Sequence, residues 1–556
     1  MGMHRKWMPV ILLCSWIVIT VAFGQGPVYT EDRLAAERLG PVTEKIDRTQ
    51  YKNIFHISAT TGSDKRGDGS KEEPWQTIGR GLMHTVGSTS KSRSALCVAA
   101  GDYAENTIAM QPHVDLYGGF ESRTWTRDII KHRTILDGER VRRVVKAADS
   151  ARIDGFVITG GLAVSHGGGI LCDDSSPEIS NNIIRDNTVL GPAAFNHTRI
   201  HQEGIQGGGI ACRYNALPVI RNNIITGNRT AIGNGAGIAF YGWVRKAGMP
   251  EYKTVENRLA GAHRAKVLNN VIIFNRAGIN DLHRTRSSNG GGISVGFEAR
   301  PLIQNNLIAM NDAGGRGDAG GIYIEYFADP DIIGNWVLGN TSDDDGGGLY
   351  TMRLGQPLIE GNIFSGNYTR SGGAGAIRLS KEGRATIVFN LITENRGGGV
   401  IAVDSYLELR SNIIARNTGR PGVSIQNKFT YFRPSAVIDN ILFDNAEGNL
   451  DLRDAPDLIF EGNQEGSGQL NVIKTKPLVL NESRFDTLNC ITRIVTDSTE
   501  PLSEELTGTV VHIGNNWSLV KSVSGKDLIV WGDITPGVEE KAMIEVLPLY
   551  QVTNEE

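Results

Sequence analysis

Nine copies of one short pattern of polar and apolar positions occupy residues 182 to 445. Each copy reads Asn, two apolar residues, two variable positions and a second Asn. The paired Asn residues are Asn182 and Asn187, Asn223 and Asn228, Asn270 and Asn275, Asn306 and Asn311, Asn335 and Asn340, Asn362 and Asn367, Asn390 and Asn395, Asn412 and Asn417, and Asn440 and Asn445. A pattern that recurs in this way predicts a repeat architecture.

A Gly-rich step followed by an aliphatic residue precedes most copies, and the aliphatic residue usually stands 12 or 13 positions before the first Asn. The aliphatic residues are Ile170, Ile210, Ile238, Ile293, Ile322, Leu349, Ile377 and Val400. Short runs of Ile and Val punctuated by Gly and Asn predict strands joined by turns rather than helices.

The spacing of the units indicates the fold class. Successive first Asn residues are 41, 47, 36, 29, 27, 28, 22 and 28 residues apart, so the closed unit needs 22 residues and the excess is insertion. One unit cannot bury its apolar side alone, whereas stacked units form a solenoid. Leucine-rich repeats would need Leu where this chain has Ile and Val, and the Gly-Gly-x-Gly-x-Asp pattern of calcium-binding β-rolls is absent. The sequence predicts an all-β, single-stranded, right-handed parallel β-helix.

The repeated Asn residues have a structural explanation in such a fold. Asn tolerates left-handed backbone and suits tight turns between strands. In stacked coils each amide can donate to one neighbour and accept from the next, which satisfies polar groups that would otherwise be buried without a partner. We therefore interpret these residues as a structural ladder rather than as ligands.

Alternation along the strand after each Gly step predicts which side chains face outward, with the aliphatic residue facing inward. The aromatic residues of this outward stripe are Tyr241, Phe297, Tyr323, Tyr326 and Tyr350, interleaved with Arg, Lys and Glu. Aromatic rings stack on sugar faces, and charged groups bind hydroxyls or carboxylates. We predict that these five residues bind an extended polysaccharide.

Cleavage of a polysaccharide requires further groups. A lyase needs a base and a group that neutralises the uronate carboxylate, whereas a hydrolase needs two carboxyls. Glu325, Arg353, Arg378 and Lys381 are the catalytic candidates for the first chemistry. Asp173 with Asp174, or the run from Asp343 to Asp345, would serve the second. The alternative is that all of these are solvated surface charges and turn residues.

Three insertions, at residues 188–206, 243–265 and 276–289, lengthen the early units. All three lie at or just after the same part of the unit, so we expect them to project from one face and to wall a groove. Functional residues on solenoids often gather beside such insertions.

Composition narrows the class of protein. The chain has 556 residues, of which 68 are Gly, as turn-dense β architecture requires. A net charge of −4 argues against a nucleic-acid partner. Residues 1–24 combine a basic start with an apolar run, which is typical of a signal peptide, and no later run is long enough to span a bilayer. We expect a secreted or cell-surface protein, with the periplasm as an alternative, that acts as a monomer.

Four cysteines follow the apolar N-terminal run: Cys97, Cys172, Cys212 and Cys490. Cys172 and Cys212 each lie two residues after a Gly-Gly-Gly-Ile step, so they would stack inward on adjacent coils. We interpret them as buried free thiols, with a disulfide as the alternative. No Cys and His spacing suggests a metal site.

Residues 52–165 carry the segments that resemble a known family. These are Val114-Asp-Leu-Tyr-Gly-Gly-Phe120, Thr134-Ile-Leu-Asp-Gly138 and Ile153-Asp-Gly-Phe-Val-Ile-Thr-Gly-Gly161, after a polar turn at residues 62–69 and a capping helix expected near Thr77 to Val86. Their succession looks like the opening coils of secreted bacterial proteins with the pectate-lyase-like β-helix. The Gly steps with paired Asn residues also resemble repeats of polymorphic outer-membrane proteins.

The resemblance covers most of residues 52–465 and concerns the fold more than the activity. The paired-Arg motif of pectate lyases is missing, as are the Asn-Thr-Asp, Gly-His-Gly and Arg-Ile-Lys motifs of polygalacturonases, for which His166-Gly167-Gly168 is only a partial match. No catalytic residue can be carried over. Calcium enters only as something the resemblance implies, since no motif for a cofactor is present.

The C-terminal part differs in pattern. We expect regular coils at residues 166–468 and a cap or small β module at residues 469–556, where short alternating strands are separated by polar turns. Two functions remain open at this level: a β-helix that binds an extended polysaccharide, with or without cleaving it by lyase or glycosidase chemistry, and a non-catalytic surface or matrix repeat protein.

Overall fold

The computed structural model describes residues 35–191, 206–242, 264–279, 288–427, 435–455, 457–465, 469–471, 478–547 and 551–553. The predicted signal peptide lies outside these ranges, and so do residues 192–205, 243–263 and 280–287 of the three insertions. Within the described ranges, no helix has the length and apolar composition needed to cross a membrane.

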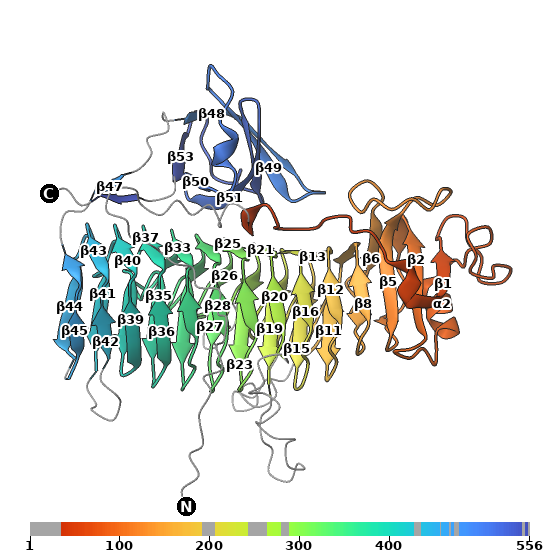
Figure 1. Ribbon diagram of the computed structural model, residues 1–556, viewed down its shortest axis with the longest axis horizontal. Helices are drawn as coiled ribbons and strands as arrows, with labels where there is room; N and C mark the ends of the chain where they lie inside the picture. The colour runs from red at the N-terminus through yellow and green to blue at the C-terminus, as the bar shows by residue number, and fades with distance from the viewer. Residues whose placement is uncertain are drawn as a thin grey trace, which may run out of the picture.

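Long parallel sheets run the length of the molecule, and Figure 1 shows their strands in register along its long axis. In the described part of the chain, the 14-stranded sheet consists of β1 (Tyr51–Ile57), β2 (Arg93–Ala99), β5 (Val114–Phe120), β8 (Arg152–Asp154), β12 (Glu178–Ser180), β16 (Val219–Arg221), β20 (Lys266–Leu268), β24 (Leu302–Gln304), β28 (Asp331–Ile333), β32 (Leu358–Glu360), β36 (Arg384–Val388), β39 (Tyr406–Arg410), β42 (Ala436–Ile438) and β45 (Ile459–Glu461).

The 12-stranded sheet is formed by the segments that follow the Gly steps. It consists of β4 (Ile108–Ala109), β7 (Val145–Lys146), β11 (Ile170–Asp173), β15 (Ile210–Arg213), β19 (Ile238–Tyr241), β23 (Ile293–Gly296), β27 (Ile322–Ile324), β31 (Leu349–Met352), β35 (Ile377–Ser380), β38 (Val400–Val403), β41 (Val423–Gln426) and β44 (Leu450–Asp454).

The 13-stranded sheet contains the apolar residues between the paired Asn residues. It consists of β3 (Gly101–Tyr103), β6 (Thr134–Asp137), β9 (Phe156–Thr159), β13 (Ile183–Arg185), β17 (Ile224–Thr226), β21 (Val271–Ile273), β25 (Leu307–Ala309), β29 (Trp336–Leu338), β33 (Ile363–Ser365), β37 (Leu391–Thr393), β40 (Ile413–Ala415), β43 (Ile441–Phe443) and β46 (Gln464–Glu465).

A 7-stranded sheet of two-residue strands closes most coils. It consists of β10 (Leu162–Ala163), β14 (Thr188–Val189), β18 (Arg229–Thr230), β22 (Arg276–Ala277), β26 (Asp312–Ala313), β30 (Thr341–Ser342) and β34 (Tyr368–Thr369). One coil runs from β11 through β12, β13 and β14 to β15, which pairs in parallel with β11. The predicted parallel β-helix is confirmed.

Inward-facing aliphatic side chains form one continuous core along the axis. Ile170, Ile210, Ile238 and Ile293 stack in this core with no measurable exposure, as alternation from the Gly step predicts. The short helix α2 (Ile78–His84) packs Ile78 and Leu82 against the first coil, and Figure 1 shows it at that end of the molecule. A covered end protects the open edge of the first strands.

Both columns of repeated Asn residues form the predicted amide ladder. In each column the Nδ2 atom donates to the Oδ1 atom of the Asn one coil further along, at 2.9 to 3.1 Å. The first column ends on Asn463, outside the repeat pattern. The second ends at Asn445, whose Nδ2 atom donates to Asn449, four residues later in the chain. The paired Asn residues are at most 7% exposed, so the ladder satisfies amides that water cannot reach.

One detail of the turn prediction is wrong. The left-handed residue is not the ladder Asn but the residue before it, such as Asn305, Phe274 or Met310, with φ between 54° and 56°. The ladder Asn keeps negative φ because its backbone N–H and side chain both bond along the axis, as in Asn306, whose N–H donates to Asn335. The residue before the ladder Asn therefore adopts the left-handed conformation that the turn requires.

The four cysteines in the described residues are buried and free. Cys172 and Cys212 are Cα partners on β11 and β15, and both belong to the aliphatic core. They act as small apolar side chains, as the sequence indicates.

The C-terminal β module is a closed antiparallel barrel. Its strands are β48 (Leu478–Asp486), β49 (Ile491–Thr496), β52 (Asp527–Trp531), β51 (Asn516–Ser524), β50 (Val510–Ile513) and β53 (Met543–Leu547), with the 3-10 turn η3 (Glu504–Leu506). A separate pair, β47 (Gln469–Asn471) and β54 (Gln551–Thr553), is antiparallel. The barrel lies on the flank of the coils rather than at their end (Figure 1).

Two glycines on the coils, Gly339 and Gly366, form the seat on which the barrel docks. Trp517 packs against the 13-stranded sheet in one cluster with Ile273, Leu307 and Leu338. A Cβ atom at Gly339 would lie 2.8 Å from the Trp517 ring, and one at Gly366 would overlap it. Gly at these two left-handed positions lets the indole lie on the backbone.

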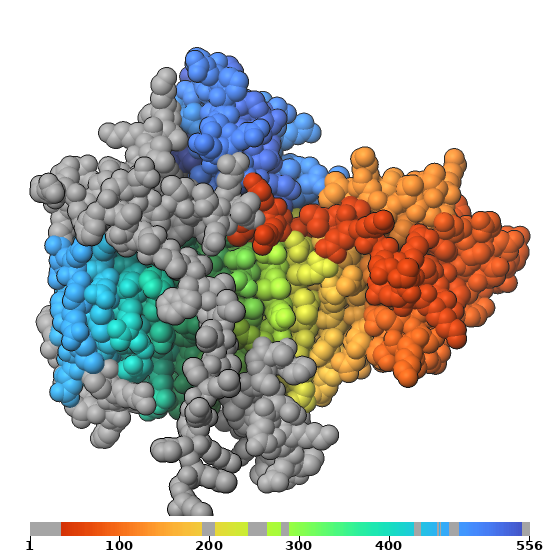
Figure 2. All heavy atoms as spheres, in the orientation of Figure 1, coloured from red at the N-terminus to blue at the C-terminus, as the bar shows by residue number. Residues whose placement is uncertain are grey.

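An N-terminal strap, residues 35–50, runs back along the coils and ends in the 3-10 turn η1 (Arg48–Gln50). Asn222 donates to the carbonyl of Arg38 at 2.6 Å, and Arg221 forms a salt bridge with Glu44. Figure 2 shows this red strap lying between the blue barrel and the coils.

Replacing Asn306 by Ala should test the amide ladder. The Asn306 Nδ2 atom donates to Val267, Gln304 and Asn335, so its loss leaves buried acceptors without partners. We expect the free energy of unfolding in urea to fall by on the order of 3–5 kcal/mol. Asn106→Ala, at an exposed Asn, is the control and should change it by less than about 0.5 kcal/mol. Equal effects would contradict the ladder.

Replacing Gly366 by Ala should loosen the barrel from the coils. The added Cβ would overlap Trp517, whereas Gly361, also left-handed, has open space around its Cβ position. Both variants carry the backbone cost of Ala at positive φ, and Gly366→Ala should lose a further ~1–3 kcal/mol. Hydrogen exchange of the β51 amides should accelerate in Gly366→Ala only. Similar exchange in both variants would contradict the docking.

Candidate functional site

The predicted site residues lie on the outer face of the 12-stranded sheet or directly after the ends of its strands. Tyr323, Tyr350 and Arg378 are Cα partners on β27, β31 and β35. Their strand neighbours Ile322 and Leu349 belong to the aliphatic core on the other side. The alternation used for the prediction therefore gives the correct face for these side chains.

The exposure predicted for three of the rings is wrong. Tyr241, Tyr323 and Tyr350 are 3%, 1% and 2% exposed. Tyr323 and Tyr350 pack against each other with ring centroids 6.0 Å apart, in one cluster with Met352. Outward-facing rows one coil apart are close enough to bury each other, which strand alternation alone does not reveal. These three rings offer no face to a sugar.

The two remaining rings, Phe297 and Tyr326, form a stacked column with Tyr241. Phe297 lies 4.4 Å from Tyr241 and 4.5 Å from Tyr326, measured between ring centroids. The Arg353 guanidinium covers the other side of Tyr326 at 4.7 Å. Phe297 and Tyr326 are partly exposed, but neighbouring groups cover their faces. Stacking of a sugar on these faces, the predicted mode, would require the column to open, and only the ring edges remain for contact.

A strained turn creates this column. Phe297 and Glu298 both have positive φ, at 53° and 62°, and the same holds for Tyr326 and Phe327 in the next coil. The corresponding residues Arg353, Leu354, Lys381 and Glu382 repeat the conformation. Two consecutive left-handed residues are unusual for bulky side chains and cost free energy. Backbone strain of this kind is often found at functional sites. The turn aligns Phe297, Tyr326, Arg353 and Lys381 along the axis.

Glu325 is held beneath the column by two donors. Its Oε2 atom accepts from the Tyr323 hydroxyl at 2.9 Å and from Arg353 at 3.0 Å. Burial raises the pKa of Glu325, and the Arg353 charge opposes that shift. Glu325 is 3% exposed, so it lies within a bonded network rather than at the surface.

Two aspartates on neighbouring coils form a carboxyl pair beside this network. The Asp345 N–H donates to Asp318 Oδ1 at 3.2 Å, and Arg378 lies 3.5 Å from Asp345 Oδ2. Burial and the Asp345 charge raise the pKa of Asp318 to about 7. The pKa of Asp345 is also raised by burial, against the opposing charge of Arg378. Both side chains are partly exposed.

Asp318 is a site residue that the sequence reasoning missed. It stands four residues before Ile322, the position that Asn289 and Asn234 occupy in the preceding coils. Asp318 N–H donates to Asn289 Oδ1 at 2.8 Å, so the carboxylates continue a ladder that begins with amides. Aligning the units on their aliphatic residues would have revealed the change from Asn to Asp.

Lys381 completes the cluster on the next coil. It is exposed, and its charge lowers the pKa of Asp318, Glu325 and Asp345. The four predicted catalytic residues thus lie together with the aspartate pair across three neighbouring coils. A carboxyl that titrates near neutral pH beside one held by a cation is an arrangement suited to acid and base chemistry.

The other predicted carboxylates have separate partners. Asp173 lies 3.4 Å from Arg213, and Asp174 accepts from the Asn215 side chain at 3.0 Å. Asp343 forms a salt bridge with Arg370 at 2.7 Å. Of the run from Asp343 to Asp345, Asp345 is the residue whose backbone N–H donates to Asp318.

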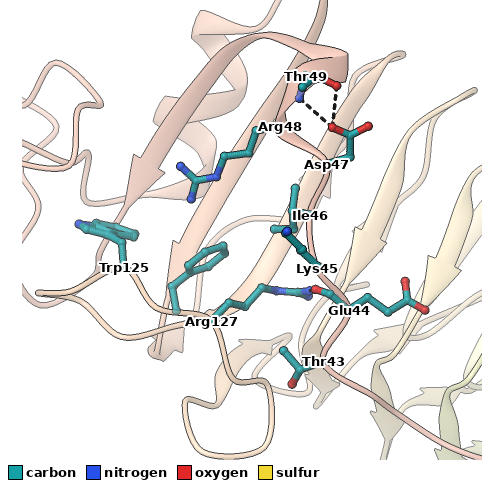
Figure 3. Close-up of a pocket in the computed structure, with 10 residues that line it drawn as sticks. Thr43, Glu44, Lys45, Ile46, Asp47, Arg48, Thr49, Trp125 and Arg127 are labelled. Atoms are coloured by element: carbon teal, nitrogen blue, oxygen red, sulfur yellow. Dashed lines mark hydrogen bonds between the residues drawn. The ribbon is translucent and has the colours of Figure 1, made fainter.

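A hollow of about 870 Å³ lies elsewhere, between the N-terminal strap and the coils. Figure 3 shows Arg127 reaching toward Glu44, with Trp125 to one side. Arg127 donates to the carbonyls of Gly118 and Glu44 and forms a salt bridge with Asp154. These groups are engaged with one another, so the hollow marks where the strap attaches.

No group of three or more His, Cys, Asp or Glu side chains among the described residues is arranged to hold a metal ion. The groove walls predicted from the three insertions fall mostly on residues outside the described ranges.

Two family models match the chain. The family described as "Right handed beta helix region" matches residues 339–464. The family described as "Protein of unknown function (DUF1565)" matches residues 60–296. No curated protein matches the chain in sequence.

Several solved structures are distantly similar. The Dettilon tailspike protein is 11% identical, with 88% of this chain and 93% of that chain covered and a TM-score of 0.39. The GH136 lacto-N-biosidase from Eubacterium ramulus is 13% identical, with 75% and 68% covered and a TM-score of 0.32. The mannuronan C-5 epimerase AlgE6 A-module from Azotobacter vinelandii is 12% identical, with 69% and 93% covered and a TM-score of 0.31.

The parallel coils, their continuous aliphatic core and the matched β-helix region agree with one another. Together they identify the chain as a right-handed parallel β-helix protein.

Proposed function

We propose that this protein binds an extended polysaccharide along the outer face of the 12-stranded sheet and hydrolyses it at Asp318 and Asp345. The observation that supports this most is the carboxyl pair on neighbouring coils, in which the pKa of Asp318 is raised to about 7. Neighbouring coils are about 4.8 Å apart. That spacing is close to the ~5–5.5 Å between the two carboxyls of retaining glycosidases.

The proposed reaction gives the two carboxyls different roles. Asp318 donates its proton to the glycosidic oxygen as the bond to the anomeric carbon breaks. The carboxylate form of Asp345, which the charge of Arg378 favours against the effect of burial, attacks that carbon and forms a glycosyl ester. Water then cleaves the ester while Asp318 accepts its proton, which restores both carboxyls.

The four residues predicted as catalytic take distinct roles in this proposal. Arg378 lowers the pKa of Asp345 against the effect of burial, and exposed Lys381 attracts anionic groups of the polysaccharide. Arg353 covers the Tyr326 ring and forms a salt bridge with Glu325, so Arg353 and Glu325 hold the outer face in place beside Asp318 and Asp345. The edges of Phe297 and Tyr326 contact sugar, whereas Tyr241, Tyr323 and Tyr350 support the face from below.

A lyase reaction is the alternative chemistry on the same face. It would use Glu325 as the base and Arg353 with Lys381 to neutralise a uronate carboxylate. The buried position of Glu325 and its bonds to Tyr323 and Arg353 favour the hydrolytic pair instead.

A non-catalytic surface or matrix protein is the second candidate function. The column from Tyr241 to Arg353 favours it, because the ring faces are used to join coils rather than to bind a ligand. In both cases we propose a single chain acting outside the cytoplasm, with a polysaccharide and not a nucleic acid as the partner of the catalytic form.

Removing either carboxyl of the pair should abolish cleavage. Asp318→Asn and Asp345→Asn should each lower kcat by at least about 100-fold, because one proton donor or one nucleophile is lost. Reducing ends and unsaturated ends released from uronate and neutral glycans report hydrolysis and lyase chemistry, respectively. Asp343→Asn, from the same acidic run, should keep the activity. Unsaturated products that depend on Glu325 would contradict the hydrolytic assignment.

The stability of the protein should depend on pH through Asp318. Its pKa is raised from an ordinary 3.8 to about 7, so the folded state binds more protons than the unfolded state between these values. The free energy of unfolding should therefore fall as pH rises through this window, by on the order of 1–3 kcal/mol. In Asp318→Asn this part of the fall should vanish in urea titrations at a series of pH values. An unchanged pH dependence would contradict the shifted pKa.

A further inference from the structure

Glu394 stands one coil beyond Gly366 in the column of turn residues on which Trp517 lies. Gly366 and Glu394 directly follow Ser365 and Thr393, which are Cα partners on β33 and β37. Both residues have positive φ, at 67° and 58°, so they occupy the same place in the turn. Because neighbouring coils are about 4.8 Å apart, Glu394 borders the seat of the barrel.

The indole of Trp517 points along the axis toward this residue. Its Cβ atom lies 2.9 Å from the Cβ position of Gly339, and its ring nitrogen overlaps that of Gly366, one coil further along. His512 on β50 stacks on the indole, with ring centroids 4.2 Å apart. The His512 Nδ1 atom lies 3.0 Å from Glu545 Oε2 on β53. The barrel therefore presents an imidazole and a carboxylate at the edge of its seat.

Charges from both sides of this contact act on the Glu394 carboxyl. On the coils, Arg416 Nη1 lies 3.8 Å from Glu394 Oε1, and the Glu394 side chain is 23% exposed. Burial raises the pKa of Glu394, the charge of Arg416 opposes this, and from the barrel Glu545 raises the pKa further while His512 lowers it. In Figure 1 the barrel strand β50 lies over β33 and β37. Docking of the barrel therefore changes the surroundings of this carboxyl.

Arg133 and Arg185 also join the coils to the barrel. They donate to backbone carbonyls of the barrel at 3.3 and 3.2 Å. Arginine stays protonated at every pH of interest. Against the effect of burial, hydrogen bonds from Asn489 lower the pKa of Asp486 in the same contact. These groups hold the barrel without responding to pH in the range where the Glu394 carboxyl titrates.

We propose that Glu394 and Glu545 form a pH-sensitive latch between the coils and the barrel, which holds the barrel when Glu394 is protonated and loosens when it is ionised. Release of the barrel returns Glu394 to water and takes it away from the Glu545 charge, so the carboxyl binds its proton less tightly in the open state. The contribution to docking is complete below the ordinary pKa of 4.5 and is lost as the pH rises through the higher pKa of the docked state. The latch concerns the flank of the coils and does not depend on the proposed function.

Cys490 reports the opening of this contact. It lies in one cluster with Trp517 and with Ile183 of the coils, and it is 4% exposed. Burial raises the pKa of Cys490 to about 11, so the thiol of the docked barrel is unreactive. Cys172 belongs to the aliphatic core of the coils and reports unfolding of the coils instead.

The test measures how fast a pyridyl disulfide modifies Cys490 in the full chain, at a series of pH values, by mass spectrometry of peptides. Glu394→Gln mimics the protonated carboxyl. Dividing the wild-type rate by the rate of this variant at the same pH removes the pH dependence of the thiol itself. Glu360→Gln, the same change on β32 of the 14-stranded sheet, is the matched control.

We expect this ratio to be near one at about pH 4.5 and to rise to at least about threefold at about pH 8, with Cys172 unmodified throughout. Glu545→Gln should show a smaller rise, because the facing charge is gone, and an unchanged rise would remove Glu545 from the latch.

A ratio that does not change with pH would overturn the latch, and so would a Glu360→Gln variant that behaves like Glu394→Gln. Modification of Cys172 as fast as Cys490 would overturn it too, because the whole chain then unfolds and the barrel is not released by itself. A Cys490 thiol that stays unmodified at every pH would show that the barrel does not open.

Discussion

The constraint on which the structure depends is that each coil must lie directly above the last, at the spacing of hydrogen-bonded strands. The two amide columns enforce this register, because every Nδ2 atom must find the Oδ1 atom of the next coil. A coil that slipped by one residue would leave buried amides unpaired and would turn aliphatic side chains toward water. The amide ladder and the aliphatic core therefore both favour the same alignment of successive coils.

Once the register is fixed, the chemistry of the outer face follows from which residues share a column. Rings in successive coils stack, as Phe297 and Tyr326 do, and a cation above a ring covers it, as Arg353 does. Burial, and after it the charge of the Asp345 carboxyl on the next coil, raises the pKa of Asp318. The same spacing stacks aromatic rings in the column after the strands of the 12-stranded sheet and brings Asp318 and Asp345 together in the column before them.

Much of the scaffold could be predicted from sequence, because its signals are local and repeated. Ile170 and Ile210 mark the core face, Cys172 and Cys212 stack as free thiols, and Asn306 joins its neighbours as the spacing implies. The burial of Tyr323 and Tyr350 could not be predicted, because it depends on contacts between coils rather than on alternation.

The same limit explains what else the sequence did not reveal. The double left-handed turn at Phe297 and Glu298 uses residues with no preference for that conformation. The change from Asn to Asp at position 318 is visible in the aligned units, but its contact with Asp345, 27 positions away, is set by the stacking of the coils. The barrel seat depends on Gly339 and Gly366 meeting Trp517, a contact between distant parts of the chain. Long-range pairing decides each of these features.

The most direct test of this account is a titration of the Asp318 carboxyl carbon by NMR, in the wild type and in Asp345→Asn. We predict an apparent pKa near 7 in the wild type and a clearly lower value in the variant, because the Asp345 charge is gone. An Asp318 that titrates near its ordinary value of 3.8 in both proteins would show that its carboxyl is neither buried nor placed beside Asp345.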